Sequence, residues 1–227
     1  MNLMTQQTLA PPADNKAVPQ AGSAHATQLE PLAGRHSDLP VAPVFLDRWS
    51  PRSLDRSRMP DRHLSTILEA GRWAPSAFNV QPWRFIYAHR GDSAWDLFTS
   101  FPDAFNQTWA DSASSLVVLL SDRVMPSRDP EHPGHPSRYN SFDAGAAWAQ
   151  IALQATILGY HAHAMAGIDQ AALRRELNIP ERYRVEIMIA IGRRDTPAHL
   201  PEELQEQETP NTRRPLDEVA FAGAFPA

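Results

Sequence analysis

Residues 142–158 read FDAGAAWAQIALQATIL, an alanine-rich segment that leaves almost no polar face on a helix. A helix that is apolar all round is buried all round. In a chain of 227 residues, this predicts a central helix or one shared between the core and a subunit interface. Its Gly and Ala positions allow another helix to approach closely, and we favour the interface.

Strand signals lie on both sides of this helix. Residues 116–120 (LVVLL) form a continuous apolar run bounded by Ser and Asp, which is typical of a strand covered on both faces. Residues 84–88 (RFIYA), 160–165 and 185–191 (VEIMIAI) are the other expected strands. The chain therefore has enough strands for one central sheet.

Further helices are expected between these strands. Residues 44–50 predict a short helix that ends before Pro51, and a second helix follows Pro60 and stops before Pro75. Residues 92–101 and 169–177 are also expected to be helical, whereas four prolines make 123–140 a loop. Mixed strands and helices with long arms at both ends predict an α+β sandwich.

Both ends of the chain differ in composition from its middle. Residues 1–40 are rich in Ala, Pro, Gln and Ser, and the first aromatic residue is Phe45. We expect a flexible N-terminal arm over 1–40, either without function or packed along a partner subunit, followed by one domain over 41–227. From Arg194 onward the sequence is again rich in Pro and Glu and predicts an extended arm.

Composition excludes several classes of function. The formal charge of −5 disfavours nucleic acid as a partner, and the absence of Cys excludes thiol nucleophiles and Cys-ligated metals. No apolar run is long enough to span a membrane, and the first thirty residues lack the pattern of a secretory signal. A cytoplasmic enzyme or binding protein is expected, with no membrane partner and no metal.

One basic segment suggests an anion site. Residues 48–53 read RWSPRS, so two arginines bracket a hydroxyl at a helix end. Arginine matches phosphate with two parallel hydrogen bonds. No two glycines are spaced as Gly-x-Gly, so side-chain cations would have to replace a glycine-rich phosphate loop. The alternative is a solvated basic turn.

A second segment combines polar side chains with irregular backbone. Residues 74–83 read APSAFNVQPW and pass from a helix through a turn into a strand. Ser, Asn and Gln offer adaptable donors and acceptors, which suit the edge of a planar heterocycle. The alternative is a capping turn with Trp83 in the core.

Together, RWSPRS and APSAFNVQPWRF resemble the nitroreductase family of FMN enzymes. The resemblance continues through SFDAGAAWAQIALQATILGY, HAHAMAGID and RRPLDEV, and so covers roughly 44–219. It implies a homodimer with a mixed, mainly antiparallel sheet flanked by helices, with FMN bound at each end of a shared interface.

The resemblance also implies roles for individual residues. The FMN phosphate and ribityl chain would be held by Arg48, Trp49, Ser50, Arg52 and Arg213. The isoalloxazine would meet Asn106, Met165, Ala166 and Gly167, with Pro75, Ser76, Ala77 and Asn79 reaching it from the neighbouring subunit.

This sequence departs from the family pattern at two positions. Trp49 stands where many members have Arg or His, and Trp109 stands where a Lys often lies near the flavin O2 and N1. A missing cation there would lower the flavin potential. Either another basic group compensates for it, or the flavin of this protein is harder to reduce.

Several aromatic and histidine side chains are secondary candidates. His163 is expected either beside the flavin or hydrogen-bonded in the core, and a metal site with His161 lacks a third ligand. Phe78, Phe101 and Phe105 are candidates for an aromatic wall, with a core role for at least one of them. His132 and His135 lie in the proline-rich loop and carry no assignment.

The function implied is hydride transfer from NAD(P)H through flavin N5 to nitroaromatic or quinone-type acceptors, by a ping-pong mechanism. The flavin then carries the hydride, and no side chain is expected as acid, base or nucleophile. The alternatives are a reductase or dehydrogenase of the same fold acting on an aldehyde, an enone or another specific substrate, or a flavin-binding module without turnover.

Overall fold

The computed structural model describes residues 35–127, 129 and 131–226, which belong to the compact unit Pro31–Ala227. The other unit, Met1–Glu30, lies outside the described residues, as do residues 1–34 of the expected N-terminal arm. Among the residues described, no helix has the length and apolar character needed to cross a membrane.

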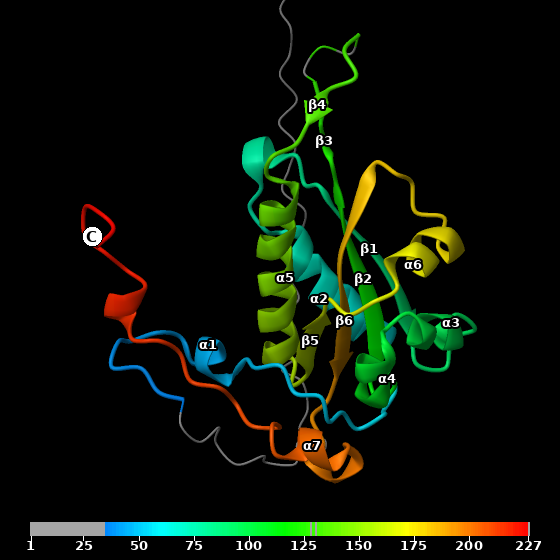
Figure 1. The fold of residues 1–227 in the computed structure, drawn as a ribbon, viewed down its shortest axis with the longest axis vertical. Helices are drawn as coiled ribbons and strands as arrows, with labels where there is room; N and C mark the ends of the chain where they lie inside the picture. Colours follow the sequence, from blue (N-terminus) through cyan, green and yellow to red (C-terminus); the bar gives the residue numbers. More distant parts are fainter. Residues whose placement is uncertain (1–34, 128, 130, 227) are drawn as a thin grey trace, which may run out of the picture. The chain divides into compact units, whose positions relative to one another are not determined.

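A four-stranded sheet forms the centre of the domain, in the order β1-β2-β6-β5 (Figure 1). Its strands are β1 (Trp83–His89), β2 (Ser115–Asp122), β5 (His161–Met165) and β6 (Tyr183–Gly192). All four expected strands are therefore present. Each neighbouring pair is antiparallel, whereas the resemblance implied a mixed sheet.

Strand β2 is buried along its whole length, as its unbroken apolar run predicts. Leu116, Val118 and Leu120 point into one apolar cluster, and Val117 and Leu119 point into the other. This alternation follows from the two-residue period of a strand. The sheet therefore needs a layer of helices on each face.

Two helices, α2 (Asp61–Arg72) and α5 (Asn140–Ile157), cover one face of the sheet. The other face is covered by α3 (Trp95–Ser100), α4 (Ala104–Ala110) and α6 (Gln170–Glu176) (Figure 1). Helix α4 was not expected, because seven residues are too few to show a clear apolar period. The Asp103 carboxylate caps it by accepting from the Asn106 backbone N–H at 2.8 Å.

The remaining elements are short. Helix α1 (Pro43–Asp47) ends one residue before the basic segment, and α7 (Glu202–Gln205) lies in the C-terminal arm. The expected loop over 123–140 contains a small hairpin of β3 (Val124–Met125) and β4 (His135–Pro136). Three single 3₁₀ turns complete the list: η1 (Ala77–Asn79), η2 (Pro197–His199) and η3 (Leu216–Glu218).

Helix α5 is buried on one side only in the single chain. Ala147 and Ile151 are fully buried against the sheet, whereas Phe142 and Ile157 are 79% and 64% exposed. Gly145 and Ala149 are exposed as well. Burial on every side is therefore not achieved within one chain.

Helices α2 and α5 pack closely at Gly71. A Cβ atom at this position would lie 2.7 Å from Cγ1 and 3.0 Å from Cδ1 of Ile151. Both distances are shorter than normal contact, so the absence of a side chain sets the spacing of the two helices.

We expect Gly71→Ala to destabilise the domain by about 1–3 kcal/mol through overpacking, although alanine is the better helix former by about 1 kcal/mol. In an Ile151→Ala background the two shortest contacts of the new methyl group are removed and the contact with Phe85 Cζ at 3.3 Å remains, so the destabilisation should be smaller. Urea unfolding of the four proteins of this cycle measures the coupling. If Gly71→Ala lowered the free energy of unfolding equally in both backgrounds, the close contact between residues 71 and 151 would be contradicted.

Candidate functional site

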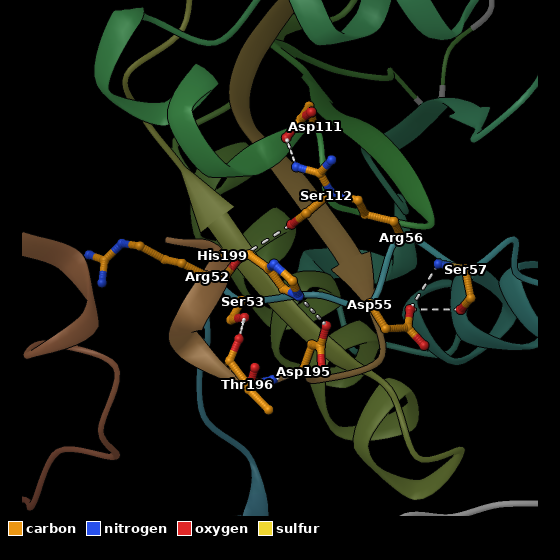
Figure 2. A network of polar contacts seen from close by, with 10 residues as sticks. All are labelled: Arg52, Ser53, Asp55, Arg56, Ser57, Asp111, Ser112, Asp195, Thr196 and His199. Atoms are coloured by element: carbon orange, nitrogen blue, oxygen red, sulfur yellow. Dashed lines mark hydrogen bonds and ion pairs between the residues drawn. The ribbon is translucent and has the colours of Figure 1, made fainter. Parts of the chain in front are cut away.

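The basic segment 48–53 is fixed to the end of strand β6. Leu54 forms an isolated antiparallel bridge with Arg194, and the Asp195 N–H donates to the Ser53 carbonyl at 3.0 Å. The Ser53 hydroxyl donates to the Thr196 carbonyl, as Figure 2 shows. In the same view the Arg52 side chain points away from this network. The backbone is thus held while the cationic group extends from it.

The C-terminal arm also holds this segment. The Glu208 Oε1 atom accepts from the backbone N–H groups of Arg52 and Ser53 at 2.7 and 2.8 Å. Sequence reasoning missed Glu208, because 156 positions separate it from Arg52 and its surroundings are simply rich in Glu and Gln. The contact fixes the arm beside the basic segment.

A cavity of about 640 Å³ lies between the basic segment, strand β5 and the C-terminal arm. This volume is in the usual range for small-molecule sites. Six of the expected residues line it: Arg48, Trp49, Ser50, Arg52, His163 and Arg213. Arg35, Gln207, Thr209, Asn211 and Thr212 line it as well and were not expected.

The cavity is strongly cationic. Burial lowers the pKa of Arg48, and the nearby charges of Arg35 and Arg213 lower it further. The Nε atom of Arg52 is buried and has no hydrogen-bond partner within the described part of the chain. Guanidinium groups that repel one another and retain free donors favour an anion with several acceptor oxygens, such as a phosphate.

Two histidines of strand β5 extend the site from the cavity toward helix α4. The ring of His163 lies against that of Trp109, tilted by 39° with centroids 4.6 Å apart, and its Nδ1 lies 3.1 Å from the Pro51 carbonyl. Since a carbonyl only accepts, Nδ1 carries the hydrogen. The ring of His161 meets the edge of Trp49 at 6.2 Å. Burial lowers the pKa of both histidines to about 4.

Helix α4 joins this group to the turn after strand β5. The Asn106 side-chain amide donates to the Gly167 carbonyl at 3.1 Å, and the Asp103 backbone N–H donates to the same oxygen at 2.9 Å. A Cβ atom on Gly167 would lie 2.1 Å from an Asp103 carboxylate oxygen and 2.7 Å from the Asn106 amide nitrogen, so a side chain at this position would displace both groups. Met165 is buried, and Ala166 is exposed beside this contact. Asn106 and Gly167, both expected at the flavin ring, thus lie in contact with each other.

The expected residues of the turn 75–81 lie elsewhere. Phe78, Asn79 and Gln81 have positive φ angles of 52°, 56° and 50°, which are unfavourable for side chains with a Cβ. The turn is held by the Ser76 hydroxyl, which accepts from the Gln81 N–H at 3.0 Å. Backbone strain of this kind gathers at functional sites.

A buried carboxylate anchors the same turn. Asp143 lies in the first turn of helix α5, and its Oδ2 atom accepts from the Ala77 N–H at 3.2 Å. Burial raises the pKa of Asp143. Sequence reasoning did not single out this residue, although it is an isolated acidic side chain in an apolar helix.

In Figure 1 strand β5, whose His163 lines the cavity, lies beside the last turns of helix α5, whereas the turn 75–81 contacts the first turn of that helix. The cavity lies beside Trp49 and strand β5, which follows the last residues of α5 in the chain. Eighteen residues at 1.5 Å each make α5 about 27 Å long. Pro75, Ser76, Ala77 and Asn79 therefore do not reach the cavity of their own chain.

The secondary candidates have separate positions. Phe101 is 1% exposed and belongs to the core, whereas Phe78 and Phe105 are 80% and 53% exposed. The guanidinium of Arg52 lies 6.0 Å from the centre of the Phe105 ring. His132 pairs with Asp129 at 2.8 Å on the surface of the hairpin loop. Phe105 thus adjoins the site, and Phe101 does not.

Comparison with known proteins gives a consistent result. Residues 46–193 match the sequence model described as the Nitroreductase family. An uncharacterised 15.4 kDa protein of Mycolicibacterium smegmatis is 31% identical over 63% of this chain and 97% of its own length. An NADH dehydrogenase of Thermus thermophilus is 26% identical over 78% of this chain and 92% of its own.

A solved structure described as an oxidoreductase containing FMN is 49% identical. It covers 85% of this chain and 96% of its own, with a TM-score of 0.81. The nitroreductase fold predicted from the sequence is thereby confirmed.

Acidification should destabilise the protein through His161 and His163. The pKa of these residues is near 6.5 in the unfolded chain and about 4 in the folded chain. Between these pH values the unfolded state binds more protons, so the free energy of unfolding decreases as the pH falls. The loss is at most about 3 kcal/mol per imidazole. Urea unfolding at pH 7, 5.5 and 4.5 measures it.

A double variant, His161→Gln with His163→Gln, should show a flatter pH dependence than the natural chain. His132→Gln, on an exposed side chain, should leave it unchanged. An unaltered slope in the double variant would contradict the burial of neutral imidazoles.

Proposed function

The chain belongs to the nitroreductase family, and from this we propose that it is an FMN-dependent oxidoreductase that transfers hydride from NAD(P)H to nitroaromatic or quinone-type acceptors. The observation that carries the proposal is the cationic cavity formed by Arg48, Arg52 and Arg213. The wall of the cavity continues from His163 to Trp109 of helix α4, the helix that also carries Asn106 of the Asn106–Gly167 contact.

The residues present fit FMN. Arg48 and Arg213 repel each other, and the Arg52 Nε atom has no hydrogen-bond partner among the described residues. Both features favour binding of an anion, such as a phosphate monoester. We propose that Arg48, Trp49, Ser50, Arg52 and Arg213 hold the phosphate and ribityl chain, and that Asn106, Met165, Ala166 and Gly167 hold the ring.

Bound FMN supplies hydride chemistry that protein side chains lack. The chain contributes position and electrostatics around it. With a pKa of about 4, His163 is uncharged at neutral pH, donates from Nδ1 to the Pro51 carbonyl and keeps Nε2 as an acceptor. Trp109 is 1% exposed and adds no charge where a lysine is frequent in the family. His163 and Trp109 therefore add no charge to the ring side of the site, where the Asp103 carboxylate lies beside Gly167, and the absence of a cation at Trp109 favours a low flavin potential.

Electron donor and acceptor are proposed to use the same open side of the site in turn. The oxidised nicotinamide then leaves before the acceptor enters, which gives ping-pong kinetics. The Asp103 carboxylate beside the Asn106–Gly167 contact caps helix α4, and among the described residues we assign no acid, base or nucleophile to one defined substrate. This is why we propose a broad class of acceptors.

We further propose that the active form is a homodimer. The expected ring-binding residues fall into two groups separated by the length of α5, so one ligand contacts both groups only if a second chain provides its turn 75–81. The exposed face of α5, with Phe142, Gly145 and Ala149, offers an apolar surface for that second chain.

The cytoplasmic location and the role of residues 1–40 as a flexible arm remain predictions from the sequence.

The purified full chain should be yellow and release intact FMN on denaturation. It should oxidise NADH or NADPH steadily when a nitroarene is added, with hydroxylamine as the product, as absorbance and chromatography will show. A colourless protein that cannot be loaded with FMN would overturn the proposal. A yellow protein that oxidises neither nicotinamide would favour a flavin-binding module.

Ala149→Glu should convert the dimer to monomers and reduce turnover, because it places a charge in the exposed apolar face of α5. Light scattering after size-exclusion chromatography measures the mass. Ala171→Glu makes the same change at an exposed position of α6, on the other face of the sheet, and should leave the dimer intact. A variant Ala149→Glu that stays dimeric would exclude this face as the interface.

A further inference from the structure

Arg35 lies outside the stretch that matches the family, which begins at residue 46. The sequence placed it in the N-terminal arm without a role. In the structure it lines the cationic cavity together with Arg48, Arg52 and Arg213. A residue that precedes helix α1 therefore contributes to a wall otherwise formed by the basic segment, strand β5 and the C-terminal arm.

A hydrogen bond fixes this position. The Arg35 Nη1 atom donates to the backbone carbonyl of Arg48 at 2.7 Å. A guanidinium carries five N–H donors in a planar fork, so this bond leaves other donors for a ligand. Since the acceptor is a backbone atom, the contact does not depend on the Arg48 side chain.

The charges in the cavity favour an additional anion contact. Burial lowers the pKa of Arg35, as does Arg213, while Asp47 acts in the opposite direction. Arg35 in turn lowers the pKa of Arg48. Like charges held together at one wall are relieved by a ligand of opposite charge, and a phosphate monoester carries nearly two negative charges at neutral pH.

We propose that Arg35 is a further phosphate-binding residue, which contacts the FMN phosphate directly from the segment that precedes α1. This proposal rests on the proposed function. It gives residues N-terminal to the family-matched stretch a part in holding the cofactor.

The test compares FMN with riboflavin, which lacks the phosphate. The full chain is freed of flavin and titrated with each ligand, and quenching of flavin fluorescence gives Kd. Arg35→Ala should raise the Kd for FMN by about tenfold or more, as expected for one charge-assisted contact. The Kd for riboflavin should change less than about twofold. The Kd of Arg35→Lys for FMN should lie between those of the natural chain and Arg35→Ala, since lysine keeps the charge but lacks the planar guanidinium.

Two other arginine variants serve as references. Arg48→Ala should also raise the Kd for FMN more than the Kd for riboflavin, because it removes a residue already proposed at the phosphate. Arg62→Ala removes a charge from the exposed surface of α2 and should leave both affinities unchanged.

A double variant separates direct contact from support of Arg48. If Arg35 meets the phosphate, Arg35→Ala should still weaken FMN binding in an Arg48→Ala background. An effect that disappears in that background would show that Arg35 acts only by positioning Arg48, and would overturn the proposal.

The remaining outcomes are also decisive. Equal losses for FMN and riboflavin would make Arg35 a structural residue. If Arg35→Ala leaves the affinity for FMN unchanged and raises only the KM for NADPH, Arg35 would instead bind the phosphate of NADPH. Either of these two results would contradict the proposal. A natural chain that binds neither flavin would instead contradict the proposed function itself.

Discussion

Burial of strand β2 on both faces is the constraint from which the rest of this fold follows. Eight consecutive buried residues cannot face water on either side, so helices must cover both faces of the sheet. Ser115 and Asp122 end the strand, and its neighbours β1 and β6 run antiparallel to it. The segment that leaves β6 and His163 of strand β5 are thereby brought next to residues 48–55, where the cavity forms.

The cavity itself depends on contacts that are distant in sequence. Segment 48–53 has no regular structure of its own. The backbone N–H groups of Arg52 and Ser53 donate to Glu208, and the Ser53 hydroxyl donates to the Thr196 carbonyl, both in the C-terminal arm. Because this backbone is held in place, the arginine side chains stay close together, although their mutual repulsion would otherwise move them apart. The arm thus has a structural role in addition to carrying Arg213.

Sequence reasoning succeeded where the signal is local. The four strands were found because apolar runs and alternation are strong patterns, and the grouping of Arg48, Ser50, Arg52, His163 and Arg213 was found because these residues match a family motif. It failed where the cause is tertiary. Glu208 and Arg35 stand in polar, low-complexity surroundings, and nothing near them in the chain indicates their partners. Helix α4 and its Asp103 cap were missed because seven residues give too short a period.

The separation of the turn 75–81 from the cavity of its own chain has a genetic consequence in the proposed dimer. Each complete site would draw its cavity from one chain and its turn from the other. A chain with a damaged cavity and a chain with a damaged turn would then form a mixed pair in which one site is whole and the other doubly defective. Two inactive alleles expressed together would restore part of the activity, a pattern of complementation that a site built within one chain does not give.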